Sequence, residues 1–217
     1  MPGPDVIVIG GSAGGIKALK GIFATFEIRP DSVFCVVLHR APQYSGLTRV
    51  LRGYTAIPIH EPSTSPWLCP LAAVTVAPPG YHLLLGNDRS PSSHPQTPVE
   101  QYEITPGVRA HLTLDSPVAY SRPSIDVAFS SAALLVNSIT AVLLSCANDD
   151  GARGCEVVQA AGGQVVLQDP VSCEAPTAVK AAMRRVEPDH VADPAGIGRW
   201  LSEVRGSGHL ASARTQT

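Results

Sequence analysis

Runs of apolar residues alternate with helical patterns along the chain. Buried strands are expected at residues 5–9, 33–38, 139–145 and 164–168. Unbroken apolar runs of this length are typical of strands that a parallel sheet buries on both faces. Helical spacing of apolar residues predicts helices at 16–26, 46–52, 152–161, 174–186 and 197–204, with a further helix that Ser124 caps. We therefore expect an α/β fold, a single doubly wound domain with a mostly parallel central sheet.

The middle of the chain interrupts this alternation. Residues 57–60 predict a short strand, placed at the periphery because it contains Pro58, and residues 61–70 predict a loop. Residues 73–77 and 81–85 flank a Pro-Pro-Gly turn and predict a small antiparallel hairpin insertion. Two more short strands are expected at 102–105 and 111–114, after a polar, proline-rich stretch at 89–98. We expect a domain over residues 1–205 and a flexible tail over 206–217.

A glycine-rich turn follows the first strand, with one serine at its centre. Gly10-Gly11-Ser12-Ala13-Gly14 fits G-x-S-x-G, a sharp strand-to-helix turn that raises a serine hydroxyl above the sheet. Free N–H groups at the start of the next helix suit an oxyanion. Ser12 is a candidate nucleophile, phosphate ligand or helix cap, and the turn alone leaves all three roles open.

Two further polar residues follow buried strands at the same expected edge of the sheet. His39 comes directly after residues 33–38, and Asp150 lies in the loop after residues 139–145. Ligands of open parallel sheets bind outside these strand ends. A neutral imidazole can serve a serine hydroxyl as general base, and a carboxylate can orient the imidazole. Asn148 and Asp149 stand beside Asp150; each of the three can cap a helix, and spacing does not say which acid faces His39.

Other residues near these loops are weaker candidates. Cys146 is a possible competing nucleophile, although nothing nearby activates it and a packed small residue is preferred. The remaining six histidines lack the spacing of metal ligands. For the substrate pocket, the candidates are Gly14, Arg40, Arg122, Asp126 and Cys146.

A dinucleotide-binding module is the main alternative. Its G-x-G-x-x-G fingerprint needs a glycine where this chain has Ser12, and an acidic residue after the second strand where this chain has His39-Arg40. An arginine at that place can hold a 2′-phosphate, so an NADP-type interpretation stays open.

Composition narrows the class of protein. The 217 residues are 44% apolar and 16% charged, with a formal net charge of −2, which favours neither nucleic acid nor an anionic membrane as partner. The chain carries no apolar run long enough for a membrane span and no signal peptide, so we expect a cytoplasmic protein. Five cysteines without a C-x-x-C pair indicate reduced thiols and weigh against disulfides and a zinc site.

Several motifs, taken in order, resemble one family. The chain is similar to the catalytic domain of the chemotaxis-type (CheB-type) protein-glutamate methylesterases over nearly its whole length. The resemblance rests on residues 9–15, 37–39, 76–83, 122–127, 147–152, 162–163 and 168–170.

The resemblance implies a Ser-His-Asp triad of Ser12, His39 and Asp150, because the family's aspartate directly precedes the Gly-Ala pair. It also implies an oxyanion hole made by the backbone N–H groups of Ala13 and Ala147. Family members hydrolyse γ-glutamyl methyl esters on the cytoplasmic helices of chemoreceptors, and some deamidate glutamines. The implied partners are therefore methylated receptor helices, without nucleic acid or membrane insertion. The resemblance also implies that the reaction needs neither a metal nor an organic cofactor.

The chain also departs from the family pattern. The first strand begins at residue 5, so we expect a stand-alone form without the phosphoacceptor receiver domain. Ala13 stands where the prototype has threonine, Cys146 where glycine is usual, and Ala178-Val179 where Met-Pro is usual. These changes border the expected site and leave a third possibility, a catalytically weak relative that acts by binding a partner.

Overall fold

The chain folds around a central sheet of seven strands. The computed structural model describes residues 3–41, 46–87, 107–135 and 138–203. The strands lie in the order β10-β9-β8-β1-β2-β5-β3, and every pair in this sheet is parallel. Their bounds are β1 Asp5–Gly11, β2 Ser32–Leu38, β3 Ile59–His60, β5 Ala73–Val76, β8 Ile139–Leu143, β9 Gln164–Gln168 and β10 His190–Ala192. The predicted fold class is confirmed.

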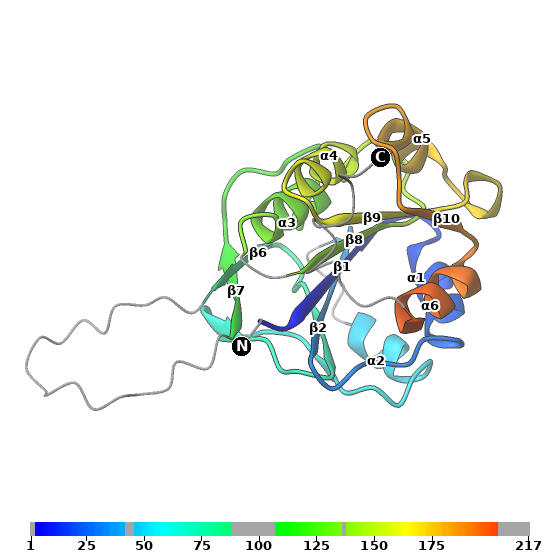
Figure 1. Ribbon diagram of the computed structural model, residues 1–217. Coiled ribbons are helices and arrows are strands. Elements are labelled where there is room, and N and C mark those ends of the chain that lie inside the picture. Colours follow the sequence, from blue (N-terminus) through cyan, green and yellow to red (C-terminus); the bar gives the residue numbers. More distant parts are fainter. Residues whose placement is uncertain (1–2, 42–45, 88–106, 136–137, 204–217) are drawn as a thin grey trace, which may run out of the picture.

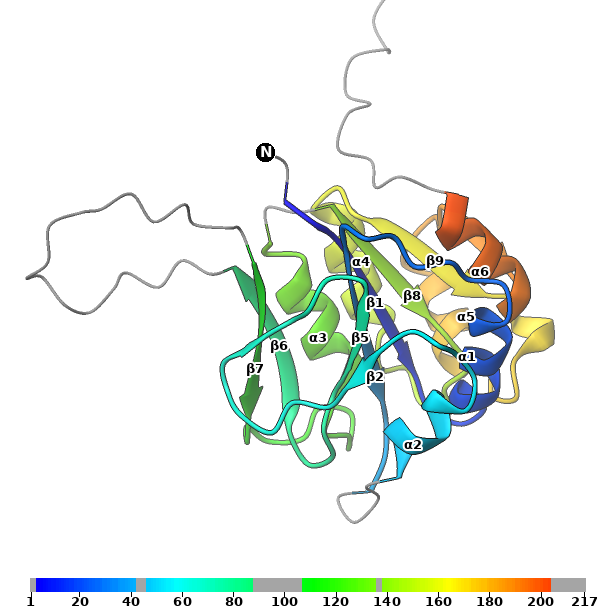
Figure 2. The ribbon, with the colours of Figure 1, turned by 90° about the horizontal axis from the view of Figure 1, so that it is seen from below.

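Helices cover both faces of this sheet (Figures 1 and 2). On one face lie α1 (Gly15–Phe23), α2 (Leu47–Arg52) and α6 (Pro194–Glu203). The other face carries α3 (Ile125–Ala132), α4 (Ala152–Ala160) and α5 (Thr177–Met183). A 3₁₀ turn at Pro170–Ser172 precedes α5. No helix in the described ranges is long and apolar enough to cross a membrane.

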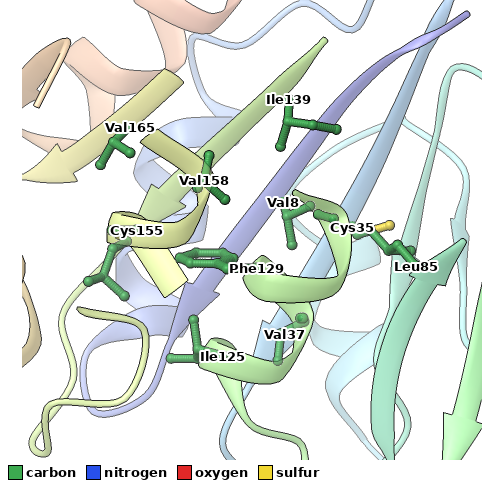
Figure 3. Packing of buried hydrophobic residues seen from close by; sticks show 14 of the residues in the cluster. Val8, Cys35, Val37, Leu85, Ile125, Phe129, Ile139, Cys155, Val158 and Val165 are labelled. Carbon is green, nitrogen blue, oxygen red and sulfur yellow. The ribbon is translucent and has the colours of Figure 1, made fainter. Parts of the chain in front are cut away.

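Alternate residues of the central strands enter two separate cores. Val6 and Val8 of β1 point to the α3–α5 face, whereas Ile7 and Ile9 point to the α1–α2–α6 face. Both sets are almost fully buried, which explains why the strand sequences are continuously apolar. In the first core, Phe129 of α3 packs among residues of α4 and the sheet (Figure 3).

A second sheet is small and antiparallel. It has the order β4-β7-β6 and consists of β4 Trp67–Leu68, β6 His82–Asn87 and β7 Val108–Thr113. Its inner residues join the core on the α3 side, where the backbone N–H of Leu85 in β6 donates to Ser131 Oγ of α3 at 2.9 Å.

Two details of the predicted middle region are wrong, and one strand later in the chain was missed. Residues 73–77 do not pair with 81–85: β5 is a parallel strand of the main sheet beside β2, and only β6 enters the small sheet. The predicted loop at 61–70 contains β4, and β10 was not predicted. The peripheral position of residues 59–60 is confirmed, since β3 is an edge strand. The predicted strand at 102–105, the stretch at 89–98 and the tail at 206–217 lie outside the described residues.

Candidate active site

The carboxyl ends of β8, β1 and β2 bring the main candidates together. The strands are neighbours in register, so that Gly11 of β1 pairs with Leu38 of β2. The N–H of His39 donates to Gly11 O at 3.1 Å, and the N–H of Ser12 donates to Ser145 O at 2.9 Å. The turn that carries Ser12 therefore lies between His39 and the loop after β8. This agrees with the expectation that the segments after the carboxyl ends of neighbouring parallel strands lie at the same edge of the sheet.

Ser12 does not cap the helix that follows it. The N-cap residue of α1 is Gly14, with φ of 80°, and no side chain caps this helix. A Cβ at Gly14 would lie 2.8 Å from Glu174 Cβ, so both the backbone angle and the close approach require glycine. Within the described part of the chain the Ser12 hydroxyl has no hydrogen-bond partner. Of the three roles that the turn left open, helix capping is excluded.

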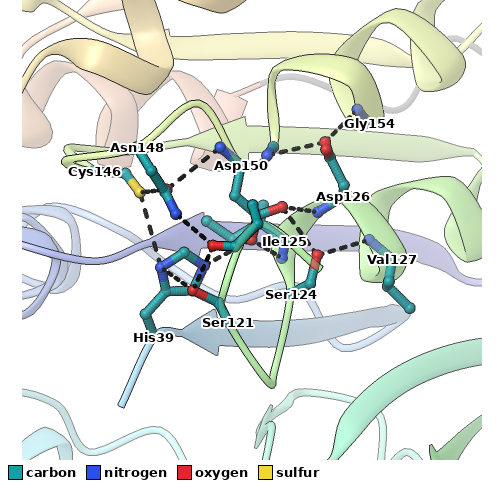
Figure 4. Close-up of polar contacts among 12 residues, drawn as sticks. His39, Ser121, Ser124, Ile125, Asp126, Val127, Cys146, Asn148, Asp150 and Gly154 are labelled. Atoms are coloured by element: carbon teal, nitrogen blue, oxygen red, sulfur yellow. Dashed lines mark hydrogen bonds and ion pairs between the residues drawn. The ribbon is translucent and has the colours of Figure 1, made fainter. Parts of the chain in front are cut away.

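The acid beside His39 is Asp150. Its Oδ2 lies 2.7 Å from His39 Nε2, and the side chain of Asp150 is fully buried. Oδ2 also accepts from the Ile125 N–H at 2.8 Å, while Oδ1 accepts from Ser124 Oγ and the Asp126 N–H, both at 2.9 Å (Figure 4). Burial acts to raise the pKa of Asp150, but the hydrogen bonds from His39 and the two backbone N–H groups outweigh it, so the pKa lies below its ordinary value.

The same pair controls the charge of the imidazole. Burial lowers the pKa of His39, yet the hydrogen bond and the charge of Asp150, together with Cys146, outweigh it and raise the pKa to about 9. Since Asp150 is ionised, Nε2 carries a proton, and the ring holds a second proton on Nδ1 in most molecules at neutral pH. Because Asp150 engages Nε2, Nδ1 is the nitrogen at which this ring gains or loses its second proton.

Nδ1 faces two side chains. Ser121 Oγ lies 3.1 Å from it and Cys146 Sγ lies 4.0 Å from it. The Cys146 thiol donates to Asn148 Oδ1 at 2.9 Å, so its hydrogen is directed away from His39. Cys146 is completely buried, which agrees with a packed residue.

Asp126 has a different environment from the one that the sequence suggested. Its Oδ1 accepts the N–H groups of Gly151 at 2.9 Å and Gly154 at 2.7 Å, the first turn of α4, which has no side-chain cap of its own. Ser124 caps α3 as predicted, by accepting the Val127 N–H at 3.4 Å. Asp126 is therefore placed as a cap for α4 and not as a residue of the pocket.

A pocket of about 470 Å³ opens beside His39. Its lining residues are His39, Arg40, Ala41, Gly80, Pro117, Tyr120, Ser121 and Arg122. Of the five residues predicted for the pocket, Arg40 and Arg122 line it, whereas Gly14, Asp126 and Cys146 do not.

Both pocket arginines already have protein partners. Arg40 Nη2 lies 3.1 Å from Glu61 Oε1 and donates to Ala77 O at 2.5 Å. Arg122 Nη1 donates to the carbonyl groups of Leu114 at 2.8 Å and Asp115 at 3.0 Å. Arg40 is thus not presented for a 2′-phosphate, which weighs against the dinucleotide interpretation.

The two groups expected to stabilise an oxyanion are available. Within the described ranges, neither the Ala13 N–H nor the Ala147 N–H donates to a protein acceptor. Ala147 is exposed in the loop after β8, and Ala13, the residue that follows Ser12 in the sequence, is half-buried. Among the residues that the structure describes, no group of three or more His, Cys, Asp or Glu side chains has metal-binding geometry.

Several residues that support the site were not predicted. Ser121 contacts Nδ1 from a chain segment 82 residues away, and Asn148 Nδ2 donates to Ala119 O at 3.0 Å, which links that segment to the loop after β8. His82 is buried and joins Ser116 O, at 3.1 Å from Nε2, to the Ser124 N–H, at 3.2 Å from Nδ1. No local pattern marks these contacts, because each joins segments that only the tertiary fold brings together.

Comparisons with known proteins identify the family of the chain. The family described as CheB methylesterase matches residues 7–201. A Leptospira interrogans relative, to which protein-glutamate methylesterase and protein-glutamine glutaminase activity is attributed, is 32% identical over 86% of this chain and 88% of its own. A Cupriavidus metallidurans protein-glutamate methylesterase/protein-glutamine glutaminase is 32% identical over 77% of this chain and 43% of its own. The crystal structure of the Thermotoga maritima CheB methylesterase catalytic domain has the same fold, with a TM-score of 0.76 at 23% identity, over 94% of this chain and 99% of that one.

Proposed function

Because the chain belongs to the CheB methylesterase family, we propose that it is a protein-glutamate methylesterase that works through Ser12, His39 and Asp150. The observation that carries the proposal is the His39–Asp150 pair, with Nε2 and Oδ2 2.7 Å apart. The two residues follow β2 and β8, the neighbours of β1 on either side, and the turn after β1 carries a serine that caps no helix. Ser12 is the nucleophile, His39 the general base and acid, and Asp150 the residue that fixes the ring.

Acylation begins when the neutral imidazole takes the Ser12 proton at Nδ1, because Asp150 occupies Nε2. Ser12 Oγ then attacks the carbonyl carbon of the γ-glutamyl methyl ester. The N–H groups of Ala13 and Ala147 donate to the oxyanion that forms. His39 returns the proton to the methoxy oxygen, methanol leaves, and the glutamyl group stays on Ser12 as an ester.

Deacylation repeats these steps with water. His39 Nδ1 takes a proton from a water molecule as it attacks the glutamyl ester, and then gives the proton to Ser12 Oγ as the acid is released. Asp150 stays ionised throughout and stabilises the imidazolium. If the reacting carbonyl belongs to a glutamine side chain, ammonia leaves instead of methanol, which is the second reaction in the names of the relatives.

The proposed substrates are methylated cytoplasmic helices of chemoreceptor-like proteins. The names of the relatives support a glutamate side chain of a protein as the reacting group. The pocket beside His39 opens to the surface, and Arg122, whose hydrogen bonds go to neutral carbonyl groups, brings a positive charge to it, which agrees with an acidic protein segment as the partner.

The test is methanol release from methyl-labelled receptor fragments. We expect the Ser12→Ala variant to lose at least about 10⁴-fold in kcat, as enzymes of this kind do when the nucleophile is removed. Ser130→Ala, on α3 and outside the site, is the matched control and keeps the turnover of the unmodified protein.

Three outcomes contradict the proposal in different ways. Unchanged turnover in Ser12→Ala excludes Ser12 as the nucleophile. Tight binding of NADP(H) in a thermal-shift titration favours the dinucleotide alternative. A folded protein that binds methylated helices without releasing methanol indicates a relative that acts as a binding partner.

A further inference from the structure

His39 Nδ1, the proposed proton-transfer atom, already has a partner. Ser121 Oγ lies 3.1 Å away (Figure 4). The Ser12 hydroxyl, in contrast, has no hydrogen-bond partner in the described ranges. Cys146 is the other neighbour, but at 4.0 Å and with its hydrogen on Asn148 it is the weaker one. The hydroxyl next to the base thus belongs to a residue outside the proposed triad.

The second contact of Ser121 is compatible with Ser121 as an acceptor for the protonated ring. Its hydroxyl donates to Ala119 O at 3.4 Å, which leaves an oxygen lone pair for His39 Nδ1–H. Nδ1–H donates in the protonated ring, whose other nitrogen donates to Asp150 at 2.7 Å. The imidazolium is therefore held at both nitrogens, by a carboxylate on one side and a hydroxyl on the other.

A tight turn holds Ser121 in this position. The N–H and C=O groups of Val118 and Ser121 bond to each other, at 2.8 and 3.1 Å. The two residues between them, Ala119 and Tyr120, have φ of 48° and 62°, a left-handed conformation that non-glycine residues rarely adopt. Asn148 Nδ2 donates to Ala119 O at 3.0 Å and ties the turn to the loop that carries Cys146. A backbone in this conformation at a functional site indicates that the position of its side chains matters.

We propose that Ser121 is a positioning residue for His39, which accepts the Nδ1–H hydrogen bond of the imidazolium and holds the ring on Asp150. This rests on the proposed function only in that it takes His39 as the base. Ser121 acts in each half of the reaction, when Nδ1 has taken a proton from Ser12 or from water and has not yet passed it on. A hydrogen bond to the charged form of a group favours that form.

The other charged and titratable groups near the ring are already engaged. Asp150 contacts Nε2, and the Cys146 thiol bonds to Asn148. Arg40 pairs with Glu61, and Arg122 donates to backbone carbonyls. These contacts do not involve the Ser121 side chain, so a change in His39 titration after substitution of Ser121 reports on the Ser121 hydroxyl.

The experiment is an NMR titration of the His39 ring in the free protein, with the resonance assigned from the His39→Gln variant. In Ser121→Ala, we expect the pKa of His39 to fall by about one unit, the usual effect of losing one hydrogen bond to a charged group. Ser121→Thr keeps the hydroxyl and restores the titration. Ser116→Ala, an exposed serine of the same segment, is the matched control and leaves it unchanged.

The enzymatic counterpart is the pH profile of kcat/KM for methanol release. The acid limb moves to lower pH in Ser121→Ala and returns in Ser121→Thr, which a purely structural loss of activity does not produce. An unchanged His39 titration in Ser121→Ala overturns the proposal. A Ser121→Ala variant without activity beside an active Ser12→Ala variant also overturns it, since Ser121 is then the nucleophile. A wild-type protein without esterase activity refutes the proposed function, while the titration still decides the role of Ser121.

Discussion

The buried carboxylate of Asp150 accepts hydrogen bonds from the start of α3 and stabilises the charged ring of His39. The Asp150→Asn substitution affects these two contributions differently. The substitution keeps the size of the side chain, removes its charge and turns one acceptor oxygen into an NH₂ donor. Oδ1 accepts the Asp126 N–H and Oδ2 accepts the Ile125 N–H. Whichever oxygen is replaced, one backbone N–H in the first turn of α3 loses its acceptor.

The larger effect is on His39. Burial lowers the pKa of His39, but it is raised from the ordinary 6.5 to about 9, and the hydrogen bond to Asp150 is the largest of the causes that raise it. In Asp150→Asn this contribution is lost while burial still lowers the pKa, so His39 should titrate well below 9. The difference between 6.5 and about 9 corresponds to about 3 kcal/mol of interaction between the imidazolium and its surroundings.

The pH dependence of stability has a defined sign. The pKa of His39 is higher in the folded than in the unfolded protein, so its contribution is complete below about pH 6.5 and is lost as pH rises through about 9. The pKa of Asp150 is lower in the folded protein, so its contribution is present above the ordinary value of 3.8 and is lost at lower pH. The variant should therefore be least stable relative to wild type between about pH 4 and 6.5, by about 3–5 kcal/mol, and the gap should narrow towards pH 9.

The assay combines urea unfolding at several pH values with NMR titration of His39. Asp149→Asn is the matched control, because it removes a neighbouring exposed carboxylate that has no contact with His39. It should leave the His39 titration near the wild-type value. A His39 resonance that still titrates near 9 in Asp150→Asn would refute the reasoning, as would a stability gap that does not change between pH 6 and 9.

Two further predictions concern the backbone around the site. Asp126→Ala removes the side chain that caps α4, so the free energy of unfolding should fall by about 1–2 kcal/mol with little change in KM; a raised KM at unchanged stability would indicate a pocket residue instead. Gly151→Ala should cost about 3 kcal/mol or more, because φ is 98° and the new Cβ would lie 2.5 Å from Leu143 Cδ1. Gly162→Ala, with φ of 83° and open space around the Cβ, should cost only about 1 kcal/mol, and equal costs at the two glycines would contradict the role of packing.

The sequence predicts best those strands that the fold buries completely. In β1, β2, β8 and β9 the burial of both faces leaves a continuous apolar run, and the predicted ends lie within two residues of the observed ones. β10 lacks such a run because its three residues are half-buried or exposed. β4 has two residues in a proline-rich segment and is identified only by its pairing with β7.

β5 shows a different limit. Its four buried residues were recognised as a strand, but the Pro-Pro-Gly turn after it suggested a hairpin with the next strand. Its partners are β2 and β3, which lie in the main sheet. A turn pattern describes local geometry, whereas the choice of partner depends on which surface the strand can bury, and only the assembled fold contains that information.

The residues of the site also fall into two groups, those that local sequence patterns predict and those that only the tertiary fold brings into place. Ser12, His39 and Asp150 were candidates because each follows a buried strand, and strand ends are fixed by local patterns. Ser121 has no such mark: it lies before α3 and reaches His39 through a turn whose conformation ordinary residues seldom adopt. Asp126 lies within residues 122–127, one of the stretches that resemble the family. Its carboxylate nevertheless accepts N–H groups at the N-terminus of α4.

The carboxylates of Asp126 and Asp150 join the starts of α3 and α4 to each other, and this connects the fold with the chemistry of the site. Asp150, just before α4, accepts N–H groups at the start of α3, and Asp126, in the first turn of α3, accepts N–H groups at the start of α4. The positive end of each helix dipole thus faces a carboxylate, which acts in favour of the ionised form, although burial and the charge of Asp150 still hold the pKa of Asp126 above its ordinary value. The charge that fixes the His39 ring is stabilised by the same contacts that hold α3 against α4. A loss of packing between these helices should therefore appear first as a change in the titration of His39, before the sheet is affected.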